Sequence, residues 1–168
     1  MITLGTMNKA TRKEYTNFLK DNNVKIFDYG PGSTYGILTK RNYFKKINQS
    51  KIALRFSGRD IKKNIHPLRI DPMSKFLKNQ TVGVNDYFSC GTFLLCENMA
   101  LERKVRRNKH LVFFKSKEDL LKKVKYFLKN DKKREKIQKN CFKLFCDHYQ
   151  EKKLIQKISK KIYMRLHK

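Results

Sequence analysis

The sequence predicts an α/β fold: a parallel sheet of about five strands with helices on both faces and a helical C-terminus. Short apolar runs alternate with segments of helical spacing between Ile2 and Phe114, as in strands joined by helices. The run Phe93–Cys96 is apolar throughout and lies between Gly91 and Glu97, which favours a strand buried on both faces. Beyond Tyr149, apolar residues recur at helical spacing: Leu154, Ile155, Ile158, Ile162 and Leu166.

The N-terminal part of the chain is expected to hold three strands separated by two helices. Asn8 is a suitable N-cap for the first helix, and Gly30-Pro31-Gly32 requires a loop because proline fixes its own backbone while glycine relaxes it. In order, we expect a strand at Ile2–Leu4, a helix from Asn8 to about Asp21, a strand at Val24–Tyr29, a loop at Gly30–Ser33, a helix at Thr39–Gln49 and a strand at Ser50–Phe56.

The C-terminal part begins with an irregular connection and then returns to alternating strands and helices. Arg59–Asn79 contains Pro67 and Pro72 and has little periodicity, and connections of this length are commonly functional. Gly91 is suited to end a short helix in the left-handed conformation. The remaining expected elements are the strand Phe93–Cys96, a basic patch at Arg103–Arg107, a strand at Leu111–Phe114, a helix capped by Ser116 with Asp119, and a helix from Asp131.

Length and charge narrow the possible functions. With 168 residues and 39% hydrophobic residues, the chain can form one domain with a real core, which we expect to span residues 1–168. The formal charge of +27 attracts polyanions such as nucleic acid, anionic lipid headgroups or phosphorylated substrates. An alternative is that the lysines reflect an AT-rich genome, because they are spread along the chain rather than gathered in one tail.

The cysteines indicate neither disulfides nor a metal site. Cys90, Cys96, Cys141 and Cys146 form no Cys-x-x-Cys pair, and no secretory signal precedes them. Cys141 and Cys146 lie in a helical pattern, where a buried hydrophobic role is favoured over a metal site with His148. No apolar run approaches the ~20 residues of a transmembrane helix. We therefore expect no metal and no cofactor, and a cytoplasmic protein or one peripheral to a membrane.

The segment from Thr81 to Asn98 resembles a motif of the nucleotide-sugar-binding, C-terminal half of two-domain (GT-B) glycosyltransferases, in the group 1 and spore-maturation type. In that family, Arg-x-Phe-Glu precedes a small residue, Cys-Gly and an apolar strand that ends in an acid. Ser89–Leu95 and Glu97 match this pattern here. Asp86 stands in place of the family's Glu, Asn85 in place of Phe and Gly83 in place of Arg.

The resemblance covers nearly the whole chain and implies a Rossmann-like fold. Gly5-Thr6 with Arg12 and Tyr15 resembles the opening of the same half, and so does Tyr29–Ser33. His110–Leu120 resembles the family's strand and following helix, with the closing helix after it. Family members also carry an N-terminal half, which generally supplies the catalytic base. By this resemblance the chain corresponds to the second half, so the resemblance identifies no catalytic residues in it.

The resemblance implies a donor site made of loop backbone, cations and acids. Three cations are candidates for the diphosphate: Arg12, Lys51 and Arg55. Asp86 or Glu97 would accept hydrogen bonds from the ribose. The implied donor-binding residues are Gly5, Thr6, Arg12, Gly32, Ser33, Gly83, Asp86, Gly91, Thr92 and Glu97.

Two functions follow as expectations. The first is a glycosyltransferase-like domain that binds a nucleotide sugar and transfers the sugar when a partner chain, a homodimer or an N-terminal half completes it. The C-terminal helix, with its apolar stripe, is the expected contact for such a partner. The alternative is a non-catalytic basic module that binds nucleic acid or an anionic membrane surface.

Overall fold

The computed structural model describes residues 2–4, 10–56, 84–97 and 104–149, together with the single residues Gln156, Ser159 and Met164. Several expectations fall outside these residues: Gly5, Thr6, Asn8, Gly83, the connection Arg59–Asn79, Arg103 and the apolar stripe from Leu154 to Leu166.

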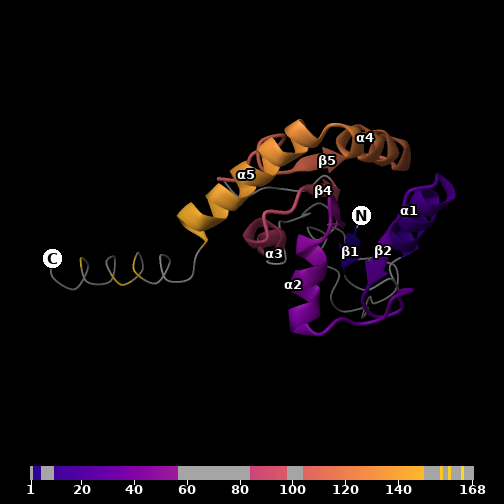
Figure 1. Ribbon diagram of the computed structural model, residues 1–168, viewed down its shortest axis with the longest axis horizontal. Helices are drawn as coiled ribbons and strands as arrows, with labels where there is room; N and C mark the ends of the chain where they lie inside the picture. The colour runs from indigo at the N-terminus through magenta and orange to yellow at the C-terminus, as the bar shows by residue number, and fades with distance from the viewer. Residues whose placement is uncertain are drawn as a thin grey trace, which may run out of the picture.

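A five-stranded parallel sheet forms the centre of the fold, as the alternating pattern predicts. The strands are β1 (Ile2–Leu4), β2 (Phe27–Tyr29), β3 (Ala53–Arg55), β4 (Leu94–Glu97) and β5 (Val112–Phe114), in the spatial order β2-β1-β3-β4-β5. The helices are α1 (Ala10–Asp21), α2 (Lys40–Asn48), α3 (Val84–Ser89), α4 (Lys117–Lys129) and α5 (Asp131–His148). Figure 1 shows α4 and α5 running along one side of the molecule, with α1 and α2 around the sheet.

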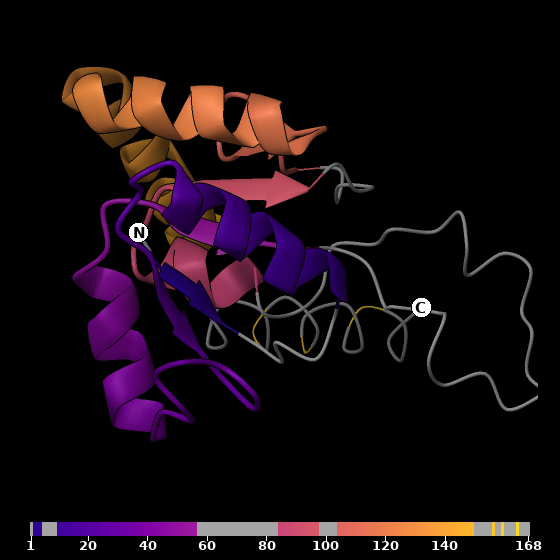
Figure 2. The same cartoon turned by 90° about the vertical axis from the view of Figure 1, so that its right-hand side faces the viewer.

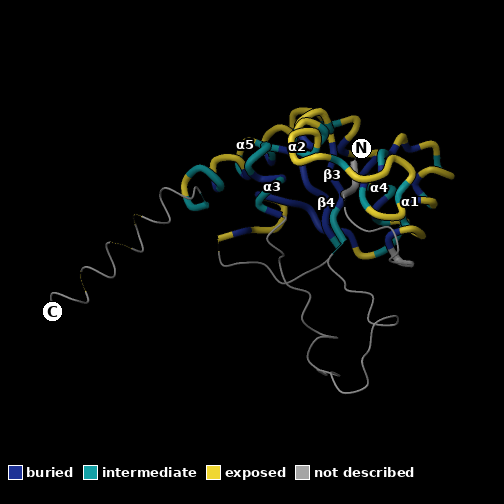
Figure 3. Tube along the Cα trace, turned by 90° about the horizontal axis from the view of Figure 1, so that it is seen from below, coloured by how far each residue is buried: buried dark blue, intermediate teal, exposed yellow. Residues whose placement is uncertain are grey.

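Helices cover both faces of the sheet. Alternate side chains of a strand point to opposite faces, so Leu94 and Leu95 belong to two different hydrophobic clusters. One cluster joins the sheet to α2, α3 and the second half of α5. The other joins it to α1 and α4, and Figure 2 shows α4 lying along β5. In Figure 3 the strands are buried, while the exposed stretches lie on the outer surfaces of the helices.

Local sequence signals account for the ends of several elements. Thr39 caps α2, and the Ser116 hydroxyl accepts a hydrogen bond from the Asp119 N–H at 3.2 Å at the start of α4, as the capping pattern predicts. Gly91 has φ 59°, the left-handed conformation expected after α3. β2 and β3 are shorter than expected, although Val24 and Ile52, which precede them, are still buried.

Two negative findings apply to the described part of the chain. No helix there is long and apolar enough to cross a bilayer. Nor does any group of three or more His, Cys, Asp and Glu side chains among those residues come together in a way that could hold a metal ion. Cys96 and Cys141 are buried and reduced, in agreement with a packing role, while Cys90 and Cys146 are half-buried.

Candidate functional site

The strand order creates a topological switch point at the carboxyl ends of β1 and β3. β1 lies between β2 and β3, so the chain leaves β1 towards one side of the sheet and later returns on the other. In open parallel sheets, ligands bind outside the carboxyl ends of the strands at such a point. The residues at this place in the described structure are Arg12, in the first turn of α1, and Arg55, the last residue of β3.

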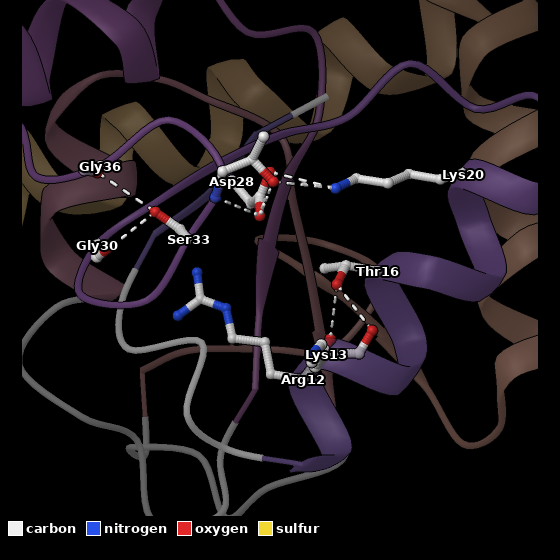
Figure 4. A network of polar contacts seen from close by, with 9 residues as sticks. Arg12, Lys13, Thr16, Lys20, Asp28, Gly30, Ser33 and Gly36 are labelled. Carbon is white, nitrogen blue, oxygen red and sulfur yellow. Dashed lines mark hydrogen bonds and ion pairs between the residues drawn. The ribbon is translucent and has the colours of Figure 1, made fainter.

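Arg12 is a buried cation at the switch point. Its side chain is only 4% exposed, and burial lowers its pKa to about 10, with Tyr87 and Asp28 acting in the opposite direction and Arg55 in the same one. The guanidinium therefore stays protonated at neutral pH. Figure 4 shows it extending from the start of α1 towards the loop that carries Gly30 and Ser33.

Arg55 brings a second guanidinium to the same place. It is half-buried and stands beside Cys96 of β4 in the register of the sheet. Burial raises the pKa of the Tyr87 hydroxyl to about 12, and both Arg55 and Arg12 act against this rise, so the three groups lie within electrostatic reach of one another. Two like charges held together in a partly buried position favour an anion between them.

Asp86 lies in the first turn of α3 and is held by α2. The Tyr43 hydroxyl donates a hydrogen bond to Asp86 Oδ2 at 2.9 Å. The pKa of Tyr43 is raised by burial, by Tyr87 and by this bond, while Arg55 opposes the rise. We refer to these five residues as the arginine cluster: Arg12, Arg55, Tyr43, Tyr87 and Asp86.

Glu97 lies at the same edge but on the opposite face of the sheet. It follows Cys96, which faces α3, and successive side chains of a strand alternate. Burial and then the charge of Glu97 raise the pKa of Tyr15. The Tyr15 ring packs against Phe56 and Phe114 with centroid distances of 5.6 and 5.7 Å. These four residues, Glu97, Tyr15, Phe56 and Phe114, are called the Glu97 cluster below.

The Gly30–Gly36 loop follows β2 and is closed by its own hydrogen bonds. The Ser33 hydroxyl donates to Gly30 O at 2.6 Å, and the Ser33 N–H donates to the same oxygen at 3.1 Å. Buried Asp28 accepts from the N–H and hydroxyl of Thr34, at 3.2 and 3.1 Å. Gly32 has φ 72°, which favours glycine. Gly32 and Ser33 therefore shape a wall near Arg12, and the Ser33 donors are used inside the loop.

Gly91 and Thr92 lie at the other end of the sheet. They precede the amino end of β4, so the whole length of this strand separates them from Glu97. The Thr92 hydroxyl is buried and donates to Ile47 O of α2 at 3.2 Å, while Gly91 packs beside Phe142 of α5. Lys51 also precedes its strand, β3. Of the three candidate cations, the structure brings together Arg12 and Arg55 and leaves Lys51 at the opposite edge.

Tyr43 and Tyr87 were not expected from the sequence, whereas Arg55 was expected as one of three candidate cations for the diphosphate. Arg55 carried a usable signal, because it is a charged residue at the carboxyl end of an apolar strand. The sequence gives no such signal for Tyr43 and Tyr87, because an aromatic residue at helical spacing is expected to belong to the hydrophobic core.

Comparisons with known proteins identify the family of the chain. A family model described as glycosyl transferase-like matches residues 17–159, which is most of the chain. The chain belongs to this glycosyl transferase-like family. Among solved structures it is similar to the C-terminal domain of a glycosyl transferase group 1 family protein (LpcC) from Francisella tularensis, at 15% identity and a TM-score of 0.49, covering 89% of this chain and 86% of that one. No protein with a curated function matches the sequence.

Membership of the glycosyl transferase-like family agrees with the resemblance found in the sequence. The matched range includes α2 to α5 and four of the five strands, and therefore every member of the arginine cluster except Arg12.

Proposed function

We propose that this domain binds a nucleotide-sugar donor at the carboxyl edge of the sheet, with the diphosphate at Arg12 and Arg55. The observation that carries the proposal is the meeting of these two guanidiniums at the topological switch point. Guanidinium groups bind phosphate oxygens through paired hydrogen bonds, and a diphosphate would neutralise two charges that otherwise repel each other. The backbone N–H groups of Gly5, Thr6 and Gly83 stay in the proposal on the family resemblance alone.

The Glu97 cluster suits the nucleoside. A carboxylate can accept hydrogen bonds from two neighbouring ribose hydroxyls, and half-buried Tyr15 and Phe56 offer ring surface beside it. Asp86 is a second acid, fixed by Tyr43 near the arginines. Gly91 and Thr92 are no longer part of the proposed site, because they lie at the amino edge.

Sugar transfer, in this proposal, requires the second half of a GT-B enzyme, from the same polypeptide or from a partner chain. The carboxyl edge would then form one wall of the cleft, and the catalytic base would come from the other half. The domain alone is expected to bind the donor without transferring its sugar.

Thermal protection by uridine diphosphate tests donor binding. A ligand at 100 times its dissociation constant adds about 2.7 kcal/mol to the free energy of unfolding. Arg55→Gln and Arg12→Gln should each weaken binding roughly 10- to 100-fold, because each removes charge-assisted hydrogen bonds. Asp86→Ala and Glu97→Ala should also reduce the protection. Arg106→Gln, on an exposed residue before β5, is the matched control, and His148→Ala should leave the protection unchanged.

Salt separates a specific site from a generally basic surface. Binding in a partly buried site should persist at high salt, because screening acts mainly between exposed charges. The proposal is wrong if the protection disappears at high salt and all four site variants behave like the parent protein.

A further inference from the structure

The outer face of α5 carries a row of lysines. Its inner face is formed by Ile137, Cys141 and Leu144, which are buried against the rest of the domain. On the opposite side, four exposed lysines recur at intervals of four, three and four residues: Lys132, Lys136, Lys139 and Lys143. At 100° per residue these four lie within about 60° of one another, in one line along the helix. We call them the α5 stripe.

Folding does not account for the α5 stripe. None of its lysines forms an ion pair with another residue in the described ranges. Like charges four residues apart repel on a helix surface, which applies to Lys132 with Lys136 and to Lys139 with Lys143. Glu135 and Asp147 stand four residues from Lys139 and Lys143, but neither forms an ion pair with them in the described ranges. Lys132 also lies in the first turn, where the helix dipole disfavours a cation. A row of charges that works against its own helix fits an anionic partner that neutralises it.

The acids beside the stripe indicate the shape of that partner. Glu135 and Asp147 lie on α5 roughly 60° to either side of the centre line of the stripe. A nucleic-acid groove would enclose the helix and set phosphates against both acids. A flat surface meets only the ridge of the helix, where all the charges are positive. Figure 3 shows α5 at the outside of the described fold, where a flat surface can reach it.

We propose that the α5 stripe docks this domain onto an anionic membrane surface, with the helix axis parallel to the bilayer. Each lysine near such a surface strengthens binding about fivefold. The stripe faces away from the sheet and shares no residue with the arginine cluster or the Glu97 cluster, so membrane and donor can be bound together. This inference does not depend on the proposed donor site.

Sedimentation with lipid vesicles tests the inference. The parent protein should bind vesicles of equal parts phosphatidylcholine and phosphatidylglycerol, and not vesicles of phosphatidylcholine alone. Changing all four lysines of the stripe to glutamine should lower the partition coefficient about 600-fold. Glutamine has a helix propensity close to that of lysine, so circular dichroism should show α5 retained.

A control of equal charge separates the stripe from the general basicity of the chain. Lys13, Lys40, Lys45 and Lys109 are exposed and lie on α1, on α2 and before β5. Changing these four lysines to glutamine removes the same charge. The fold-loss of partition coefficient should be less than one tenth of the fold-loss in the stripe variant. Equal losses in the two variants would overturn the inference. So would a stripe variant that keeps vesicle binding but loses binding to a mixed-sequence RNA.

Discussion

The two edges of the sheet differ in what they bury. At the carboxyl edge, Arg12 and Arg55 lie near each other, and Asp86 and Glu97 are half-buried close by. At the amino edge, the Thr92 hydroxyl donates to Ile47 O, and buried Arg134 donates to Phe127 O and pairs with Asp131. Burying charge costs free energy that packing alone does not return. The proposal therefore assigns the carboxyl edge to a ligand and the amino edge to stability.

A cavity of about 340 Å³ at the amino edge does not change this comparison. It includes two lysines, Lys46 and Lys51, but no member of the arginine or Glu97 cluster. Its lining is Phe27, Tyr29, Lys46, Gln49, Ser50, Lys51 and Leu128. Both lysines reach solvent, so the lining holds none of the buried charge found at the carboxyl edge.

Removing the Phe93 ring is expected to have the largest effect on stability. Phe93 is fully buried just before β4, and its ring contacts Phe127 of α4 at a centroid distance of 4.4 Å. Phe93→Ala should lower the free energy of unfolding by about 3–5 kcal/mol, measured by urea denaturation. The protection by uridine diphosphate should stay the same size, measured at a temperature where the variant is folded. A folded variant without that protection would contradict the assignment of donor binding to the carboxyl edge alone.

Thr92→Val is a smaller change that also tests whether the amino edge affects stability but not donor binding. It replaces the buried hydroxyl by a methyl group of similar size and removes its bond to Ile47 O, which keeps the Ser50 N–H as a donor at 3.0 Å. The expected cost is about 0.5–1.5 kcal/mol of unfolding free energy, the net contribution of one hydrogen bond. Because Thr92 lies at the amino edge, affinity for uridine diphosphate, measured by calorimetry, should change less than twofold. A large loss of affinity at unchanged stability would return Thr92 to the donor site.

The fold could be predicted because its signals are local. A few neighbouring residues were enough to predict three features: the strand at Phe93–Cys96, the turn at Gly91 and the helix cap at Ser116. The structure confirms all three. The strand order could not be predicted in this way. It depends on which side of β1 receives β2 and β3, and no short segment encodes that choice.

The site was predicted only in part, for a related reason. Arg12, Asp86 and Glu97 were expected and lie at one edge. Gly91 and Thr92 were assigned with them through the family resemblance, yet a strand carries the chain from one end of the sheet to the other. Tyr87 was missed because its importance arises from Arg12 and Arg55, which come from distant parts of the chain.

The smallest expected effect is a pH dependence of stability at the amino edge of the sheet. His110 is buried before β5, and its Nδ1 accepts a hydrogen bond from the Arg106 N–H at 3.0 Å. Burial lowers the pKa of His110 below its usual 6.5, and the nearby charges of Lys109 and Arg106 lower it further. The unfolded chain therefore binds the proton first as pH falls. Stability should decrease as pH falls below 6.5, until His110 is also protonated in the folded state.

His110→Asn tests this, because the asparagine oxygen can accept the same bond but does not titrate. The variant should lose about 1 kcal/mol or less at pH 7, and the His110 contribution to the slope of unfolding free energy below pH 6.5 should disappear. His148 is the control, since it lies at the end of α5 beside Lys104 and has no buried acceptor role. His148→Asn should keep the slope of the parent. If the slope is the same in all three proteins, His110 is not its source.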